Sequence, residues 1–554
     1  MRRIAKKLGK ILLIVLGIFL FLFLVLCIYL YRISKLDPPV IADKSVLQWQ
    51  RSEPSAGFYT LGPNWFRHSK SGLYELYVEG KDFERGVING KLTQELVQRQ
   101  EDHFAEQISK MIPSAFYRQF LKYFVGWFNR DLPHQVSDEY KREIYGISLS
   151  ASGQYGYIGT PYQRLLNYHA AHDIGHALQS MALVGCTSFA TWNGHSADSS
   201  LIIGRNFDFW VGDKFAEDKI VAFFKPADGY GFMTVTWGGF IGAVSGMNEK
   251  GLTVTINAAK TAIPPGAATP VSLVAREILQ YASNIGEAIA VAKRRKMFVS
   301  ESFLIGSAAD NKAVIIEKTP DSLDVYDPGG DHIICTNHLQ GDALLHSEAN
   351  EQQMKESASP YRYRRMEELV AAAGKNTVAQ TVAILRDHRG YRDADIGLGN
   401  EKAVNQFIAH HSIVFEPKKG LVWVSTAPWQ LGSFICYDLG KVLGLRGMQS
   451  DREIADSSLD IGPDSLLFSP QFQAFQRFRS YRQRILDGGS VAPDSIVASN
   501  PTYYHAWVLA GDESRKKGDC AAAVNYYKKA LTMEIATMGE RKSVEEAIAA
   551  CSKK

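Results

Sequence analysis

Cys186 is the residue whose type and neighbours best suit covalent chemistry. A thiol is a competent nucleophile only as a thiolate, so it needs a cation or a hydrogen-bond donor beside it. Arg205 and Asp208 follow it by about twenty residues and are candidates for that role. A single cysteine, judged alone, is more often a buried and inert core residue. The case for Cys186 therefore depends on the pattern of the whole chain.

The segment that carries these two charged residues is expected to be a strand, because the apolar run Leu201–Ile203 leads into it. Side chains alternate between the two faces of a strand. Arg205 and Phe207 then share one face, and Asn206 and Asp208 share the other, unless the strand bends or bulges there. Strand geometry thus decides which charged group faces the thiol.

The composition is that of an ordinary globular protein, with 46% hydrophobic and 22% charged residues. A chain of 554 residues exceeds a single hydrophobic core, so we expect two or more domains with appendages. The formal net charge is only +4, and part of the excess lies in the first ten residues. We therefore expect no nucleic-acid partner.

An uncharged apolar run extends from Ile11 to Tyr31; as a helix it spans ~31 Å and can cross a bilayer. The positive flank before it is the heavier one, with Arg2, Arg3, Lys6, Lys7 and Lys10 against Arg32 and Lys35. The heavier flank stays cytoplasmic, so we expect a single-pass membrane protein whose bulk is periplasmic or extracellular. A cleaved signal peptide is the alternative, but the run is long for one and Ile28–Arg32 lacks small residues. We prefer an uncleaved anchor.

A helical stretch from about Leu165 to Ala182 carries His169, His172, Asp173 and His176. Side chains three and four positions apart share a helix face, so the histidines are candidate metal ligands. A polar helix face or a buried hydrogen-bonded histidine is the simpler interpretation, because no cysteine or carboxylate elsewhere completes an obvious site. The six cysteines are sparse and irregularly spaced, unlike a disulfide framework or a zinc motif, although an exported domain allows some pairing. We expect no metal and no cofactor.

The expected secondary structure changes twice along the chain. Before Cys186 it is mostly helical, with one short strand at Leu73–Val78. From Ser188 to Asp438, short strands rich in β-branched and aromatic residues flank two pairs of helices, which is typical of an α+β domain with helices covering sheet faces. Beyond about Gly447 the pattern is helical again.

The last helices carry one unit that resembles a tetratricopeptide repeat, with Trp507, Gly511, Gly518, Ala523, Tyr527 and Ala530 at the expected positions. A generic amphipathic helical hairpin fits these residues equally well. A lone repeat cannot bury its own face, so we expect it to pack on neighbouring helices or on the main domain. This segment is where a protein partner is expected.

Several short motifs occur in a specific order between about Tyr74 and Leu439. They are Gly80–Gly90 with Arg85 and Gly86 inside it, Gly185–Phe189, Gly204–Asp208, Gly246–Leu252, Asn257 and Cys335–His338. With this order and spacing, about two thirds of the chain resembles the acyl-coenzyme A:isopenicillin N acyltransferase-like family, a branch of the N-terminal-nucleophile hydrolases. The same residues show the core pattern of the related choloylglycine (bile salt) hydrolases.

The resemblance implies a four-layered αββα core and self-cleavage between Gly185 and Cys186. The thiol attacks the preceding carbonyl, an N-to-S shift gives a thioester, and hydrolysis frees the amino group of Cys186. That α-amine has an intrinsic pKa near ~8, so it can take the thiol's proton close to neutral pH. One residue then supplies both nucleophile and base, and the uncut precursor is expected to be inactive.

The family match also assigns roles to charged residues near Cys186. Asp208 is expected to hold the α-amine, and Arg205 to favour the thiolate; a structural ion pair at a strand end is the alternative. Arg362 resembles a further active-site arginine, although Arg364 or Arg365 also fits that position.

Two asparagines complete the expected site. Asn257 and Asn337 match positions whose side-chain or backbone donors serve the oxyanion and the N-terminus, a role worth ~3 kcal/mol per donor. The alternative for both is turn chemistry.

The resulting segments are a cytoplasmic tail (1–10), a transmembrane anchor (11–31), a spacer (32–72), a mostly helical pro-segment (73–185), an αββα catalytic domain (186–445), a helical linker (446–499) and a tetratricopeptide-like segment (500–554). We expect a membrane-anchored, self-processing cysteine amidohydrolase or acyltransferase that cleaves a small, lipid-like amide through a thioester. The alternative is a membrane-tethered scaffold that presents its C-terminal helices to a partner.

Overall fold

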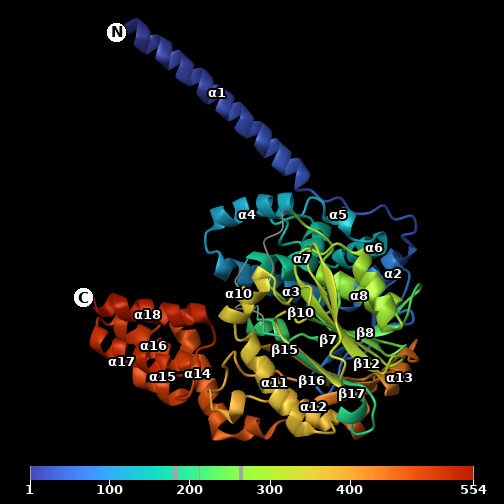
Figure 1. Ribbon diagram of the computed structural model, residues 1–554. Helices are drawn as coiled ribbons and strands as arrows, with labels where there is room; N and C mark the ends of the chain where they lie inside the picture. Colours follow the sequence, from blue (N-terminus) through green and yellow to red (C-terminus); the bar gives the residue numbers. More distant parts are fainter. Residues whose placement is uncertain (1, 179–184, 211, 261–265, 553–554) are drawn as a thin grey trace.

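Two β-sheets stacked face to face form the centre of the computed structural model, which describes residues 2–178, 185–210, 212–260 and 266–552 (Figure 1). Within these residues the larger sheet has eleven strands. In spatial order they are β1 (Ser52–Ser55), β2 (Phe58–Leu61), β3 (Asn64–His68), β4 (Tyr74–Gly80), β7 (Ile220–Pro226), β8 (Phe232–Thr236), β9 (Ser245–Asn248), β10 (Leu252–Ala258), β11 (Glu301–Ser307), β12 (Lys312–Lys318) and β13 (Leu323–Tyr326). β4 pairs with β7 in parallel, and the other neighbours are antiparallel.

The smaller sheet has six antiparallel strands within the described ranges. Their order is β14 (His332–Cys335), β5 (Thr187–Thr191), β6 (Ile202–Asp208), β15 (Ala409–Glu416), β16 (Leu421–Ser425) and β17 (Phe434–Asp438). The strands after Cys186 thus lie in the part of the chain where the sequence pattern predicts strands.

Alternation along the strands creates an apolar layer on each side of the larger sheet. On β7, Val221 and Phe223 point into the space between the sheets, where they share one core with residues such as Ile413 and Val422 of the smaller sheet. Phe224, on the opposite face of the same strand, joins a second core with the covering helices. Burial on both faces explains why β7 is apolar at nearly every position.

Helices cover the outer face of each sheet. α8 (Val271–Tyr281), α9 (Ile285–Arg294) and α2 (Asp82–Leu92) pack on the larger sheet. α11 (Ser359–Ala373) and α12 (Val378–Leu385) pack on the smaller one, where Met366 and Val382 contact Phe189 and Val414. The predicted αββα order is therefore confirmed.

The other α-helices of the described residues flank these layers or lie between their strands in the sequence. They are α1 (Arg2–Ile33), α3 (Gln94–Met111), α4 (Ala115–Phe128), α5 (Leu132–Gln135), α6 (Asp138–Ser148), α7 (Pro161–Leu178), α10 (Glu348–Glu356), α13 (Leu439–Leu443), α14 (Pro470–Leu486), α15 (Pro493–Ser499), α16 (Tyr504–Lys516), α17 (Cys520–Leu531) and α18 (Met538–Ser552). α1 projects away from the body as a single long helix (Figure 1). Its segment Lys6–Ile33 is long and apolar enough to cross a membrane.

The prediction that residues 32–72 form a spacer is wrong. Three strands, β1 to β3, lie within this range and extend the larger sheet. Trp65 is fully buried between the sheets, and the buried Arg67 pairs with Glu75 on β4. Sequence reasoning missed these strands because they are short and contain charged and polar residues whose partners lie elsewhere in the fold.

The C-terminal helices α14 to α18 pack together beside the smaller sheet's helices (Figure 1). Residues 446–499 are more than a linker, because Phe472, Phe475 and Ile496 form one core with Tyr503 and Tyr504 of the following segment. The prediction that the last helices pack on neighbours is confirmed by this core. Their identity as a tetratricopeptide unit stays a prediction.

The motif Gly80–Gly90 serves helix packing. Gly86 of α2 lies against α6, and a Cβ at this position would be 2.1 Å from the backbone oxygen of Glu143. The Glu143 carboxylate is buried and accepts hydrogen bonds from Arg85 at 2.5 Å and from Arg276 at 2.8 Å. A glycine next to an arginine thus permits both the close helix contact and the buried ion pair.

We predict that Gly86→Ala lowers the free energy of unfolding by ~3 kcal/mol, at the upper end of overpacking effects, because the added methyl group meets backbone that cannot rotate away. Thermal or urea unfolding of the purified chain measures this effect. Gly539→Ala is the matched control, since that helical glycine is exposed and a Cβ there contacts nothing closer than 3.9 Å. Equal stability of the two variants would contradict the proposed close contact.

Candidate active site

Cys186 lies immediately before β5, between the two sheets, and its side chain is fully buried. The Sγ atom is 3.6 Å from Nη2 of Arg205 and 3.9 Å from the backbone oxygen of Asp208. Burial raises the pKa of the Cys186 thiol to about 11, although the Arg205 charge opposes this shift. In this structure the thiol is therefore protonated at neutral pH.

Arg205 extends from β6 of the smaller sheet to the larger sheet. Its guanidinium donates to the backbone oxygens of Val244 and Ile256 and to the Ser245 hydroxyl. It also lies 4.3 Å from the centre of the Phe207 ring, so these two side chains share a face as alternation predicts. Burial lowers the pKa of Arg205 from its ordinary value, and the nearby thiol opposes this shift. The charge is thus fixed beside Sγ by neutral acceptors, without a bound carboxylate.

Asp208 ends β6 and is completely buried. Neither carboxylate oxygen has a hydrogen-bond partner within the described residues. Burial raises its pKa to about 7, against the opposing charges of Arg362 and Arg205. An unpaired buried carboxylate is costly and rare. Among the described residues this carboxylate is thus a buried acceptor without a donor.

Asn257 does not sit in a turn of the kind the alternative interpretation requires. Asn257 lies within β10, where it accepts from Ser188 and donates to the backbone oxygens of Cys335 and Thr336. Both of its amide hydrogens are therefore occupied, and the side chain joins the two sheets next to Cys186. Asn337 follows β14 and donates to Ala258 O.

Arg362 is the arginine of α11 that reaches the site. Its guanidinium donates to Oδ1 of Asn337 at 2.5 Å, and its charge lowers the pKa of Asp208. Arg364 is exposed, and Arg365 pairs with Asp387, so neither takes this position. Burial lowers the pKa of Arg362 to about 10, which leaves it charged at neutral pH.

Two residues near Cys186 were missed by sequence reasoning. Nε2 of Gln406 donates to the backbone oxygen of Gly185 at 2.6 Å. Glu301 is fully buried with both carboxylate oxygens unpartnered among the described residues, and burial raises its pKa well above the usual value. Neither residue lies in a recognisable motif, and Gln406 is 221 positions from its partner, so no local signal marks them.

The histidine helix α7 does not support a metal site in the described part of the chain. His169 is buried, with Nδ1 2.8 Å from Leu165 O and Nε2 accepting from the backbone N–H of Ile241. Both ring nitrogens are thus engaged by backbone, as the simpler interpretation predicts. The side chains of His172 and His176 lie outside the described residues. No cluster of three or more metal-binding side chains occurs among those that are described.

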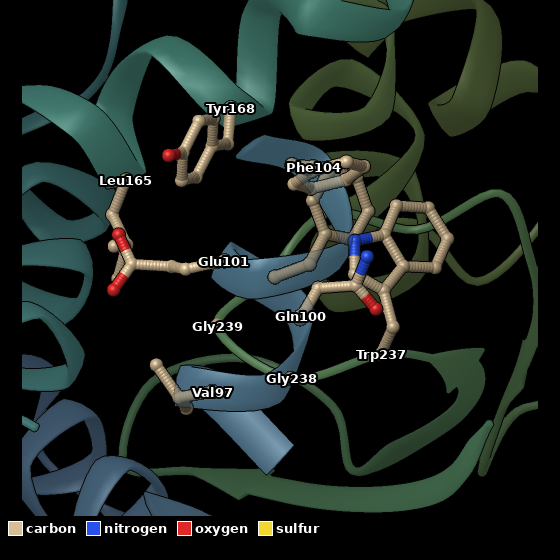
Figure 2. A pocket seen from close by; sticks show the side chains of 10 residues that line it. Val97, Gln100, Glu101, Phe104, Leu165, Tyr168, Trp237, Gly238 and Gly239 are labelled. Carbon is tan, nitrogen blue, oxygen red and sulfur yellow. The ribbon is translucent and has the colours of Figure 1, made fainter. Parts of the chain in front are cut away.

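A pocket lies between α3, α7 and the segment 237–240 (Figure 2). Its cavity volume is only about 10 Å³, so the side chains that line it nearly fill it. Phe104, Tyr168 and Trp237 give it an aromatic lining. Gln100 Nε2 and the Tyr168 hydroxyl are buried there without a hydrogen-bond partner in the described structure.

A known family matches the part of the chain that contains most of these site residues. Residues 192–428 match the sequence profile of the acyl-coenzyme A:6-aminopenicillanic acid acyl-transferase family. The predicted family resemblance is confirmed. The matched range contains Arg205, Asp208, Asn257, Asn337 and Arg362, and Cys186 lies six positions before it.

Two curated relatives match about half of the chain. An uncharacterized protein of Archaeoglobus fulgidus is 23% identical over 276 residues, which are 46% of this chain and 45% of that protein. Protein dcd1B of Dictyostelium discoideum is 26% identical over 271 residues, which are 46% of this chain and 51% of that protein. The chain thus spans only about half the length of these relatives.

Solved structures with similarity include an N-acylethanolamine-hydrolyzing acid amidase ortholog of Caenorhabditis elegans, with a TM-score of 0.31, 18% identity and coverage of 42% of this chain and 93% of that one. A conjugated bile acid hydrolase of Clostridium perfringens has a TM-score of 0.29, 14% identity and coverage of 49% of this chain and 96% of that one.

We predict that Asp208→Asn, made in a Cys186→Ala chain, raises the free energy of unfolding at pH 8. The native carboxyl has a pKa of about 7, whereas the unfolded one lies near ~3.9, so its ionisation in the folded chain costs about 4 kcal/mol. This cost develops between about pH 4 and pH 7 and is constant above, so the gain should vanish near pH 4. Urea unfolding at several pH values measures it.

Asp387→Asn is the matched control, because that carboxylate is paired with Arg365 and its loss should destabilise the chain at pH 8. A gain for Asp208→Asn that does not change with pH would contradict an unpaired carboxylate.

Proposed function

We propose that this protein is a self-processing cysteine amidohydrolase or acyltransferase with Cys186 as its nucleophile. The observation that carries the proposal is the unpartnered carboxylate of Asp208 beside a buried thiol and a fixed guanidinium. Cleavage before Cys186 would supply the new α-amine, which is both a base for the thiol and, when protonated, a partner for this carboxylate.

The proposed activation begins with attack of the Cys186 Sγ on the carbonyl carbon of Gly185. The S–C bond forms, the C–N bond to Cys186 breaks, and the thiol's proton ends on the departing nitrogen. Water then hydrolyses the thioester, which gives the Gly185 carboxyl group and restores the thiol. The resulting α-ammonium is a cation of the kind that the Asp208 carboxylate can hold.

The mature enzyme repeats this chemistry on a substrate amide. The neutral α-amine, with an intrinsic pKa near ~8, takes the thiol proton, and the Arg205 charge stabilises the thiolate. Attack on the substrate carbonyl gives an acyl-enzyme and releases the amine. Water as acceptor completes hydrolysis, and an amine acceptor completes acyl transfer.

We predict that the purified wild-type chain contains a fragment that begins at Cys186, and that Cys186→Ala remains one chain without activity. Intact mass spectrometry and N-terminal sequencing measure the cut. Cys436→Ala is the matched control, because that cysteine is also buried but lies on β17 in the core with the covering helices. A wild-type chain that stays permanently uncut would instead support a non-catalytic scaffold.

We propose that α1 anchors the protein in a membrane, with the N-terminus cytoplasmic as the positive flank predicts. The position and the exposed side chains of α4 favour a bilayer next to the body of the protein. It lies at the end from which α1 projects (Figure 1), and a Cβ at Gly126 of α4 would be 2.4 Å from Ser34 at the end of α1. Phe116 and Phe120 are 85% and 62% exposed on this helix. Exposed aromatic rings next to a spanning helix suit the membrane interface.

We also propose a lipid-like N-acyl amide as the substrate class. A row of aromatic contacts connects the catalytic arginine to the pocket of Figure 2: Phe207 contacts Phe209, Phe209 contacts Phe215, and Phe215 contacts Trp237, with ring centres 4.9 to 5.9 Å apart. An apolar acyl group matches the chemistry of this aromatic row. Hydrolysis is favoured over transfer from coenzyme A, which is scarce outside the cytosol.

We predict that replacing Phe116 and Phe120 together by Ser lowers turnover of a long-chain N-acyl amino acid held in vesicles several-fold. Turnover of a short, water-soluble amide should stay unchanged, because α4 contributes no residue to the site. Phe468→Ser is the control, since this aromatic is 74% exposed but lies next to α14. If processed enzyme cleaves polar amides and leaves long-chain amides intact, the substrate proposal is wrong.

A further inference from the structure

The carbonyl of Gly185, which the proposed self-cleavage attacks, is already held by a side-chain donor. Nε2 of Gln406 lies 2.6 Å from this oxygen, and both groups are buried. On the other side of the same residue, the Gly185 N–H donates to the backbone oxygen of Asp208 at 3.0 Å. Gly185 is therefore held through both its carbonyl group and its amide group.

We propose that Gln406 is the oxyanion donor of the self-cleavage step, and that the C-terminal helices hold it there. The inference rests on the proposed function, because it assigns a role in the cut before Cys186. When Sγ bonds to the Gly185 carbon, the carbonyl electron pair moves to oxygen. The Gln406 N–H then stabilises the negative charge until the C–N bond breaks and the carbonyl re-forms.

The contact also explains why glycine precedes the nucleophile. A Cβ at Gly185 would lie 2.3 Å from Oε1 and 2.4 Å from Nε2 of Gln406. A side chain there would displace the donor from the carbonyl. Close approach, rather than an unusual backbone angle, is what requires glycine at this position.

Gln406 belongs to a loop, residues 395–407, that the C-terminal helices hold by apolar packing. Leu398 and Phe407 are buried in one core with Phe475 and Tyr503. Phe407, directly after the donor, has a φ of 57°, a left-handed conformation that is costly for a bulky residue. Its ring lies 5.0 Å from that of Phe475, and this packing keeps the strained residue in place.

Hydrogen bonds from the same helices fix the backbone of the loop. Asn500 Nδ2 donates to Leu398 O, and Asn400 Nδ2 donates to Glu534 O. Lys402 pairs with the Glu534 carboxylate at 2.6 Å. The segment after residue 428 lies outside the range of the family profile, yet it determines where the loop lies.

The loop also touches the active-site arginine. Nη1 of Arg362 donates to the backbone oxygen of Glu401 at 3.0 Å. The Glu401 side chain accepts from Tyr503 and Tyr504 of the C-terminal helices. One loop thus connects these helices to Gly185 and to Arg362.

The test compares the rates at which newly made full-length wild-type, Gln406→Ala and Gln406→Glu chains convert to two fragments. Removing one oxyanion donor typically costs ~100-fold or more, and we expect that loss for Gln406→Ala. Gln406→Glu keeps the shape of the side chain but has no donor when ionised. Its rate relative to wild type should rise as the pH falls, because the protonated carboxyl group donates again.

Each outcome bears on one claim. If wild type cleaves and both variants cleave at its rate, Gln406 has no such role, while the proposed function stands. If the variants are slow but the Gln406→Glu ratio does not change with pH, Gln406 is merely structural and the inference is wrong. If wild type never cleaves, the proposed function fails, and the inference fails with it.

The contribution of the C-terminal helices is tested separately with Asn500→Ala. Loss of the hydrogen bond to Leu398 should slow self-cleavage several-fold at an unchanged melting temperature of the catalytic domain. Tyr526→Phe is the matched control, because that hydroxyl bonds Asp494 within the same helices, and it should cleave at the wild-type rate. Equal rates for both variants would exclude the holding role.

Discussion

The side chain of Arg205 extends from the smaller sheet to the larger sheet, where neutral hydrogen-bond acceptors surround its positive charge. Backbone oxygens of Val244 and Ile256 and the Ser245 hydroxyl take its hydrogen bonds, while Nη2 remains next to the Cys186 sulfur. A carboxylate in those positions would neutralise the charge that a thiolate needs. The rest of the site depends on this arrangement, because the thiol's pKa is otherwise set by burial alone.

The site of the uncut chain is electrostatically incomplete, and this follows from the same burial. Asp208 and Glu301 lie close to the thiol with no hydrogen-bond partner within the described residues, and the pKa of each is raised. Such groups lower the stability of the folded chain. Their retention is understandable if the molecule gains a buried cation during maturation, as the proposed cleavage provides. The same few residues would then lower the stability of the precursor and prepare the site for the proposed cleavage.

The C-terminal helices are physically connected to the site. Through the loop 395–407 they contact both the carbonyl ahead of Cys186 and the side chain of Arg362. They therefore belong to the same physical unit as the αββα layers. A protein partner that bound these helices would act on a segment already connected to the site.

The sequence predicted the strands after Cys186 from its own alternation. Through the resemblance of its ordered motifs to a known family, it also predicted the αββα layers and the gathering of Cys186, Arg205, Asp208, Asn257, Asn337 and Arg362. It could do so because strand periodicity is local and because the motifs occur in a recognisable order. It failed at β1 to β3, whose charged residues are buried only through partners on other elements, such as Arg67 with Glu75. It also could not choose among Arg362, Arg364 and Arg365, since neighbouring positions on a helix differ only in the direction they face. Only the tertiary structure placed Gln406 on the Gly185 carbonyl and left the Asp208 carboxylate without a partner, because both facts depend on contacts between residues far apart in the chain.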